Sequence, residues 1–365
     1  MSEIAEIRLH RLEVPLRTPY KLAFGLVRHF DTLIAEVTDS RGRVGLGEAT
    51  VLTGYTDETP QGSWKLMQRL ARESTGTGVE DARSKLLAGI EGAPFTVTAL
   101  VTALEMLEGA PALSLAAPVQ VPLLGLVNAE SPAELEAEID ALLERGFRTL
   151  KVKVGFDAEA DARRLRLIQR TVRGRAAIRV DANQGFGLED AKRFAAGMDP
   201  EGIELFEQPC RAGDWDAASA VAAVSTVPMM LDESIFGIED IERAAELRAA
   251  RFIKLKLMKL GSLERLAAAI EHIRALGMEP VLGNGVACEI GCWMEAMVAH
   301  THIRNAGEMN GYLKQAEPLL VHPPAFSGGA IRLEPGYRPE LDRAALRRVA
   351  RDCAEFRSSS ALARA

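Results

Sequence analysis

The segment 149–155 reads TLKVKVG and carries two lysines, Lys151 and Lys153, in an otherwise apolar run. Side chains alternate across a β-strand with a period of two residues, so both ammonium groups would leave the same side of a strand. A strand here would direct two positive charges toward one place. Other charged residues stand at the ends of later apolar runs: Asp181 in RVDANQG, Glu207 in LFEQP, Asp232 in MLDES, and Lys254 and Lys256 in FIKLKLMKLG.

The spacing of these charges matches a repeating structural unit. Steps of 24 to 28 residues separate Lys153, Asp181, Glu207, Asp232 and Lys256. Each step is about one strand plus one helix, so in a barrel of parallel strands the five residues would lie on the face where active sites form. Any one of them, taken singly, is more often a helix cap or a solvated side chain. Charges at five consecutive ends of buried strands indicate a shared function.

Three carboxylates that converge in a barrel mouth repel one another unless a cation neutralises them. No histidine or cysteine stands at these strand ends, and an all-oxygen donor set suits Mg²⁺, or Mn²⁺, better than zinc. A partly desolvated lysine near other cations should have a lowered pKa and could transfer a proton. A Schiff-base lysine is the alternative, but it leaves the three carboxylates unexplained.

The elements that position these residues follow from hydrophobic periodicity. Seven apolar runs predict parallel strands: VPLLGLV (121–127), TLKVKV (149–154), AIRVD (177–181), IELFE (203–207), MMLDE (229–233), FIKLKL (252–257) and EPVLG (279–283). Helical patterns lie between them, one with Ser131 as its expected N-cap and one that ends at Gly277. An eighth strand near IRNAGEM would complete a (β/α)8 barrel. A doubly wound sheet is the alternative, but no glycine-rich dinucleotide motif follows any strand.

The first third of the chain mixes strand and helix patterns and predicts an α+β capping domain over residues 1–118. The barrel is expected over 119–318. A C-terminal segment, 319–365, should return to the capping domain, with GGAIRLEPG as the returning strand.

Composition excludes several classes of function. The 365 residues are 47% hydrophobic with a formal charge of −7 and interspersed charges, which suits a large core and argues against nucleic-acid binding. No apolar run is long enough for a membrane span and the N-terminus does not resemble a signal peptide, so a cytoplasmic protein is expected. The four cysteines form no CxxC pair, which argues against a disulfide framework or a zinc site.

The blocks TLKVKVG, RVDANQGF, ELFEQP, MLDESIF and IKLKLMKLGS resemble the signature blocks of the enolase superfamily, in its muconate lactonizing enzyme subgroup (mandelate racemase/muconate lactonizing enzyme-like). The resemblance covers essentially the whole chain and implies a modified (β/α)8 TIM barrel with an α+β N-terminal capping domain. It implies that Asp181, Glu207 and Asp232 bind Mg²⁺. It further implies that Lys153 and Lys256 are acid/base catalysts on opposite faces of the substrate, with Lys151 in support and Lys254 as the alternative to Lys256.

This resemblance implies a reaction as well. An enzyme of this kind removes the proton α to a substrate carboxylate through a stabilised enediolate, and dehydration, racemisation or epimerisation, or cycloisomerisation follows. A small carboxylate-bearing substrate and a homo-oligomer are expected. Further residues are expected to bind or orient the substrate: Tyr20, Tyr55, Asn183, Asn284, Glu289, Glu308 and Asn310.

Two blocks near the end of the barrel bear on the substrate. The tripeptide EMN (308–310) stands where dipeptide epimerases carry an acidic DxD pair, and its second acid is replaced by Asn310. The blocks GNGVACEIGCWMEA and NAGEMNG are most similar to cis-3-hydroxyproline dehydratases and hydroxyproline betaine epimerases. A proline-type amino-acid derivative is therefore the expected substrate. Muconate-type cycloisomerisation, dipeptide epimerisation and, in another class, a non-catalytic binding barrel are the alternatives.

Overall fold

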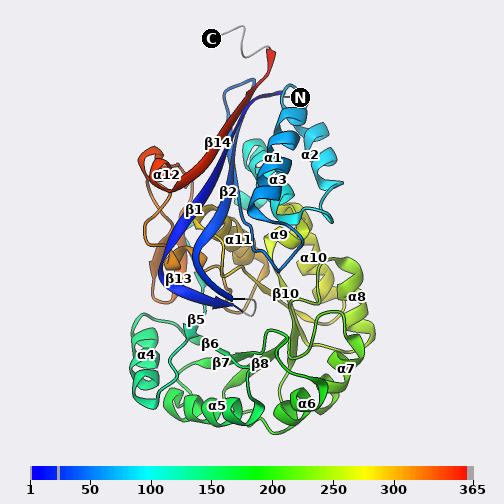
Figure 1. The fold of residues 1–365 in the computed structure, drawn as a ribbon, viewed down its shortest axis with the longest axis vertical. Coiled ribbons are helices and arrows are strands. Elements are labelled where there is room, and N and C mark those ends of the chain that lie inside the picture. The colour runs from blue at the N-terminus through cyan, green and yellow to red at the C-terminus, as the bar shows by residue number, and fades with distance from the viewer. Residues whose placement is uncertain (1, 23–24, 360–365) are drawn as a thin grey trace.

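The computed structural model describes residues 2–22 and 25–359. Its N-terminal part contains a four-stranded antiparallel sheet in the order β14-β1-β2-β3, whose strands are β1 (Ile4–Leu22), β2 (Gly25–Asp39), β3 (Val44–Thr50) and β14 (Ala350–Arg357). Two helices, α1 (Pro60–Ser74) and α3 (Pro94–Glu108), pack against this sheet, and a third, α2 (Val79–Leu87), packs against α3. Figure 1 shows the long β1–β2 hairpin running from the N-terminal end toward the barrel. The predicted α+β cap is confirmed.

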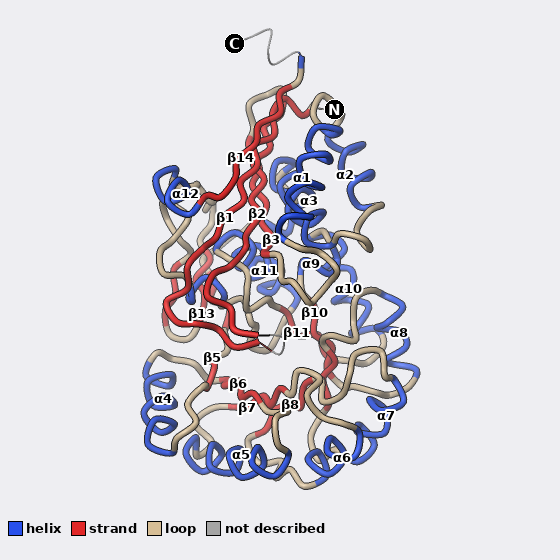
Figure 2. The backbone as a smooth tube through the Cα atoms, viewed as in Figure 1, coloured by secondary structure: helices blue, strands red, loops and turns tan. Residues whose placement is uncertain are grey.

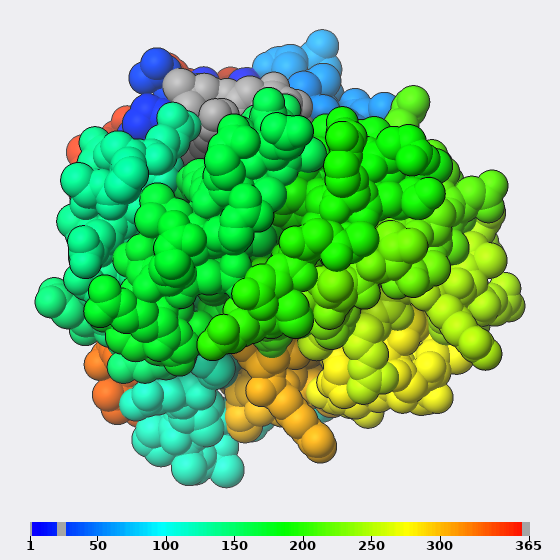
Figure 3. All heavy atoms as spheres, turned by 90° about the horizontal axis from the view of Figure 1, so that it is seen from below, coloured from blue at the N-terminus to red at the C-terminus, as the bar shows by residue number. Residues whose placement is uncertain are grey.

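Seven parallel strands form the second sheet, in the order β11-β10-β9-β8-β7-β6-β5. They are β5 (Gly125–Val127), β6 (Thr149–Lys153), β7 (Ala177–Asp181), β8 (Ile203–Glu207), β9 (Met229–Leu231), β10 (Phe252–Leu255) and β11 (Glu279–Leu282). The sheet curls into a barrel, which helices surround: α4 (Pro132–Glu144), α5 (Ala158–Val172), α6 (Leu188–Ala196), α7 (Trp215–Val224), α8 (Ile238–Glu246), α9 (Leu257–Leu260), α10 (Leu263–Ala275) and α11 (Glu289–His302). Figure 2 shows α4 to α8 outside the strands, and Figure 3 shows them as a continuous outer wall from below.

Helix ends follow the predicted local chemistry. Ser131 is the N-cap of α4, and its side chain accepts a hydrogen bond from the backbone N–H of Glu134. Gly277 follows α10 with a φ of 79°, a conformation that glycine adopts without strain.

The eighth barrel position holds no full strand in the described segment 302–310. A single bridge joins Gly307 to Leu123. Gly307 N–H donates to Pro122 on one side, and Glu308 N–H donates to Leu282 on the other. The buried guanidinium of Arg179 donates to Ala306 O (2.8 Å) and supports this short connection from inside the barrel. These hydrogen bonds close the barrel without the strand that the sequence predicted.

Two other strand predictions need correction. The run VPLLGLV divides into β5 and a separate strand, β4 (Val119–Pro122), because Pro122 cannot donate to a continuous ladder. The segment GGAIRLEPG forms β13 (Ala330–Leu333), which pairs with β4 and β12 (Ala325–Ser327) instead of the cap sheet. The strand that returns to the cap is β14, which follows α12 (Arg343–Val349) and pairs with β1. The short helices η1 (Pro111–Leu113) and η2 (Gly311–Lys314) complete the elements.

A buried carboxylate of the cap holds a barrel helix. Glu105 of α3 accepts backbone hydrogen bonds from Leu263 (2.8 Å) and Glu264 (3.2 Å) at the start of α10. We expect Glu105→Ala to lower the free energy of unfolding by about 2 to 3 kcal/mol, since it leaves buried N–H donors unsatisfied. Urea denaturation checks this, with Glu108→Ala, an exposed position on the same helix, as the matched control. Equal losses in the two variants would contradict the role of Glu105.

Candidate active site

Strand register places three of the charged residues side by side. In the parallel ladders Lys153 of β6 pairs with Asp181 of β7, and Asp181 pairs with Glu207 of β8. All three are the last residues of their strands, so their side chains gather at one end of the barrel. Asp181 and Glu207 are fully buried.

Lys151 lies beneath this group and neutralises it. Its Nζ lies 2.8 Å from Asp181 Oδ2, 2.8 Å from Glu207 Oε2 and 3.1 Å from Glu308 Oε1. Burial alone would lower the pKa of Lys151, but the charges of Asp181 and Glu207 outweigh it and hold that pKa well above its ordinary value. Lys151 is therefore a permanent cation that links three strands.

Lys153 points to the more accessible side of the group. Its side chain is 23% exposed, and Nζ donates to Asp181 Oδ2 (2.6 Å) and to Asn183 Oδ1. Asn183 has a φ of 41°, which asparagine tolerates better than most residues. Its Nδ2 donates to Glu233 Oε1 (2.8 Å), so the amide joins Lys153 to the residue after Asp232.

A second lysine group lies across the barrel, around Asp232. Lys256 Nζ, on a side chain that is 12% exposed, lies 2.9 Å from Asp232 Oδ1 and donates to the hydroxyl of Tyr55 (2.9 Å). Tyr55 comes from the cap, and its hydroxyl donates to Asp232 Oδ1 (3.2 Å). Burial of Asp232 opposes ionisation, but Lys256 and Lys259 outweigh it and hold the pKa of Asp232 well below its ordinary value.

Lys254 occupies the buried floor between the two groups. It pairs with Glu308 and lies 3.6 Å from Glu207 Oε1. Burial is the main cause that lowers its pKa to about 7. At 1% exposure its ammonium is less accessible than that of Lys256, which favours Lys256 as the lysine that meets a substrate.

Other residues that the sequence predicted for the site have polar contacts with the loops around it. Asn310 donates to Leu124 O (3.0 Å) and accepts from a neighbouring lysine, while Asn284 Oδ1 accepts from the backbone of Val286 (3.2 Å). Glu289 accepts from Leu319 N–H (2.7 Å) and Gln315 Nε2 (3.0 Å), so it ties down the segment after the barrel. These contacts hold the local backbone in place, and the role of the three residues in substrate binding stays a prediction. Tyr20 lies in β1, but its side chain is outside the part of the chain that the structure describes.

Three residues of this region were missed by sequence reasoning: Glu233, Lys259 and Lys314. Burial and the charge of Asp232 raise the pKa of Glu233 to about 7. Lys259 Nζ lies 3.0 Å from Asp232 Oδ1 and 5.3 Å from the ring centre of Phe236. The second lysine of KLMKLG was a signal for Lys259, since the spacing of three places it one helical turn after Lys256.

The donor set fits a hard divalent cation. Asp181, Glu207 and Asp232 offer only carboxylate oxygens, and both oxygens of the buried Glu207 receive no well-aligned hydrogen bond. In the described residues the three carboxylates do not bring one oxygen each within 4.8 Å of one another, and each is paired with a lysine. Cation binding would require them to turn toward a common centre.

A second set of possible metal ligands lies outside the barrel, and its ligand atoms are close enough together to share a cation. Glu13, His29 and Asp31 on the β1–β2 hairpin place ligand atoms within 4.8 Å of one another. Glu13 is paired with Arg351 of β14, and the three residues are only partly buried. The sequence reasoning did not single them out.

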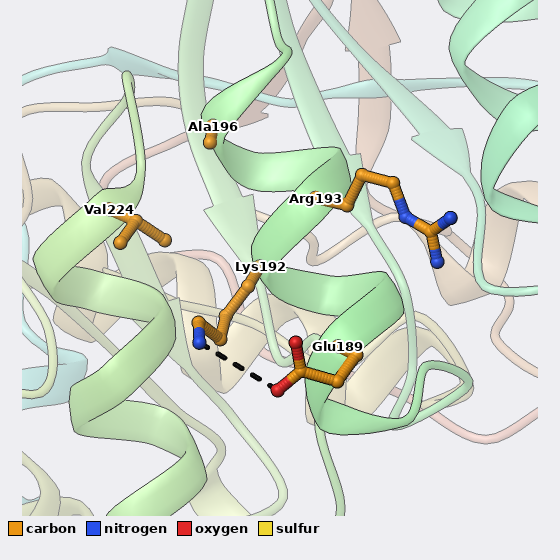
Figure 4. Close-up of a pocket in the computed structure, with 5 residues that line it drawn as sticks. All are labelled: Glu189, Lys192, Arg193, Ala196 and Val224. Carbon is orange, nitrogen blue, oxygen red and sulfur yellow. Dashed lines mark ion pairs between the residues drawn. The ribbon is translucent and has the colours of Figure 1, made fainter.

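The hollow in Figure 4 is a separate feature of the outer wall. It is lined by Glu189, Lys192, Arg193, Ala196 and Val224, from α6 and the end of α7. None of these is a strand-end residue. The arrangement at the strand ends, with two accessible lysines flanking carboxylates, is the one suited to proton transfer.

The Tyr55 hydroxyl is expected to hold Lys256 in place. We expect Tyr55→Phe to lower kcat about tenfold with a smaller change in KM, because it removes the hydrogen bonds of the hydroxyl with Lys256 and Asp232 and keeps the ring 4.4 Å from Lys256 Nζ. Steady-state kinetics check this. Tyr337→Phe, whose hydroxyl meets His322 O, is the control, and an unchanged kcat in Tyr55→Phe would contradict the role.

Comparison with known proteins agrees with this architecture. The family model described as enolase C-terminal domain-like matches residues 134–345. The L-Ala-D/L-Glu epimerase of Clostridium acetobutylicum is 29% identical over 348 residues, covering 90% of this chain and 94% of that enzyme. The N-succinyl-L-Arg/Lys racemase of Bacillus cereus is 24% identical over 313 residues, covering 81% and 82%.

Solved structures give the same fold. The crystal structure of the Bacillus cereus racemase matches with a TM-score of 0.88, covering 97% of this chain and all of that one. The dipeptide epimerase of Cytophaga hutchinsonii, solved with Mg and the dipeptide D-Ala-L-Val, matches with a TM-score of 0.88 at 22% identity and covers the same shares. The helices in the described part of the chain do not include one with the length and apolar composition of a membrane-spanning segment.

Proposed function

Because the chain belongs to the enolase superfamily, through its enolase C-terminal domain-like family, we propose that it is an epimerase or racemase of N-acylated α-amino acids, a class that includes dipeptides. The relatives named above act on dipeptides and N-succinyl amino acids. They do not support the proline-derivative dehydratase that the sequence blocks suggested.

The pair of opposed lysines carries the proposal. Lys153 lies at the end of β6 and Lys256 directly after β10, with three strands between them in the sheet. Each is accessible, and each is paired with a different carboxylate, Asp181 or Asp232. Inversion at a carbon needs a base on one face and an acid on the other, which two such lysines provide.

The carboxylates, the lysines and their hydrogen-bond partners would have separate roles in the reaction. Asp181, Glu207 and Asp232 would hold Mg²⁺, which when bound supplies a Lewis acid for the substrate carboxylate and for the charge that develops on it. Lys153 or Lys256 would take the α-proton, depending on the epimer, and the other lysine would deliver a proton to the opposite face. Asn183 and Tyr55 orient the two ammonium groups by their hydrogen bonds.

Exchange of the α-proton tests this function. Proton NMR in D₂O with Mg²⁺ should show loss of the α-proton signal for at least one N-acyl amino acid or dipeptide in a panel. We expect EDTA to abolish the exchange and added Mg²⁺ to restore it. Exchange that is unaffected by EDTA would contradict the metal-assisted mechanism, and no exchange of any N-acyl amino acid would contradict the proposed function.

A further inference from the structure

We infer that the substrate of this site carries a negative charge on its N-acyl group and that Lys314 binds this charge. The inference rests on the proposed function, because it concerns the acyl group of the same N-acylated amino acid. Lys314 is the last residue of η2, in the segment after the eighth barrel position.

Lys314 lies at a corner of the barrel mouth, between the end of β11 and Glu308. Its ammonium donates to the carbonyl oxygen of Gly285 and to Oδ1 of Asn310, the latter over 3.1 Å. A Cβ atom built on Gly285 would lie 3.2 Å from Lys314 Nζ and 3.6 Å from Glu308 Cγ. Because Gly285 has no side chain, the ammonium of Lys314 and the side chain of Glu308 both lie close to its backbone.

The polar groups of this corner favour an anion over a cation. Glu308, the acid that could attract a ligand ammonium, is paired with both Lys151 and Lys254. Asn310 is neutral, and its amide is engaged by Leu124 O and by Lys314. A ligand ammonium would have to displace a lysine from Glu308 and lie beside the ammonium of Lys314. A ligand carboxylate would instead be attracted to Lys314.

Lys314 is also accessible and well fixed. It is partly exposed to solvent, whereas Lys151 and Lys254 are buried. Burial lowers the pKa of Lys314 to about 7, and an anion bound beside it would favour the charged form. The residue that follows is held by the cap, since Arg17 Nε donates to Gln315 O (2.7 Å). A lysine held in place at the barrel mouth is suited to bind a carboxylate at the end of the substrate's acyl group.

The test compares N-succinyl, N-acetyl and L-alanyl derivatives of the same amino acids by α-proton exchange. Beside Lys314, the N-succinyl group would place a negative charge, the N-acetyl group no charge and the L-alanyl group a positive charge. We expect kcat/KM to be at least tenfold higher for the N-succinyl than for the L-alanyl derivative. Lys314→Met should lower the ratio of N-succinyl to N-acetyl kcat/KM at least tenfold, and Lys314→Arg should retain most of the ratio.

Lys192→Met is the matched control, because it removes one lysine from the hollow in the outer wall (Figure 4) and should leave the ratio unchanged. Calorimetric binding of N-succinyl and N-acetyl derivatives to wild type and Lys314→Met gives a readout independent of turnover, and the stronger binding of the N-succinyl derivative should be lost in the variant. A preference for L-alanyl derivatives, or a ratio insensitive to Lys314→Met, would overturn this inference and leave the epimerase proposal standing. No exchange of any derivative would overturn both.

Discussion

Lys256→Ala is expected to abolish interconversion of epimers, with a loss in kcat of about a thousandfold or more, because one face of the substrate loses its proton donor or acceptor. Lys153 remains in this variant, paired with Asp181 and Asn183. It should still exchange the α-proton of one epimer with solvent. Lys153→Ala should show the converse, with exchange confined to the other epimer. Chiral chromatography and NMR in D₂O measure the two quantities separately.

Lys254→Ala separates proton transfer from electrostatic support. Lys254 is buried and pairs with Glu308, so its loss should reduce activity without removing exchange from one face alone. If Lys256→Ala kept full turnover and Lys254→Ala lost it, Lys254 and not Lys256 would be the lysine that transfers the proton.

Glu207→Gln is expected to weaken Mg²⁺ binding more than a hundredfold and to abolish exchange, because it removes a negative charge from the centre of the donor set. Glu207 lies between the pairs centred on Asp181 and Asp232, and its oxygens lack well-aligned donors. Isothermal titration with Mg²⁺ measures the affinity directly.

The comparison variant for this experiment is Asp31→Asn, in the group on the β1–β2 hairpin. It removes the same charge from the alternative set of ligands and should leave both the Mg²⁺ affinity and the exchange rate unchanged. A loss of affinity in Asp31→Asn with none in Glu207→Gln would assign the cation to the hairpin instead of the barrel.

The barrel and the convergence of its charges were predictable because they depend on local patterns. Strand periodicity placed Lys151 and Lys153 on one side of β6, and the length of a strand–helix unit placed Asp181 and Glu207 at neighbouring strand ends. The structure has these residues in contact. These features can be predicted without knowing which distant segments of the chain contact one another.

Other features depend on contacts between distant segments and could not be predicted. Glu308 was expected to bind or orient the substrate, and its pairing with Lys151 and Lys254, which come from two distant strands, could not be read from the sequence. The eighth strand is replaced by a bridge that the side chain of Arg179 supports from another strand. Lys314 resembles an ordinary surface lysine in the sequence, and only the return of its segment over Gly285 places it at the barrel mouth.

The position of solvent deuterium in an epimerisation run in D₂O tests the two-lysine account most directly. Starting from one pure epimer with Mg²⁺, we predict that the first product formed carries deuterium at the α-carbon while the recovered substrate stays largely protonated. That result requires removal by one group and delivery by another that exchanges with solvent. Product that retains the original proton would contradict the account, because it would mean that a single group moves the proton between the two faces.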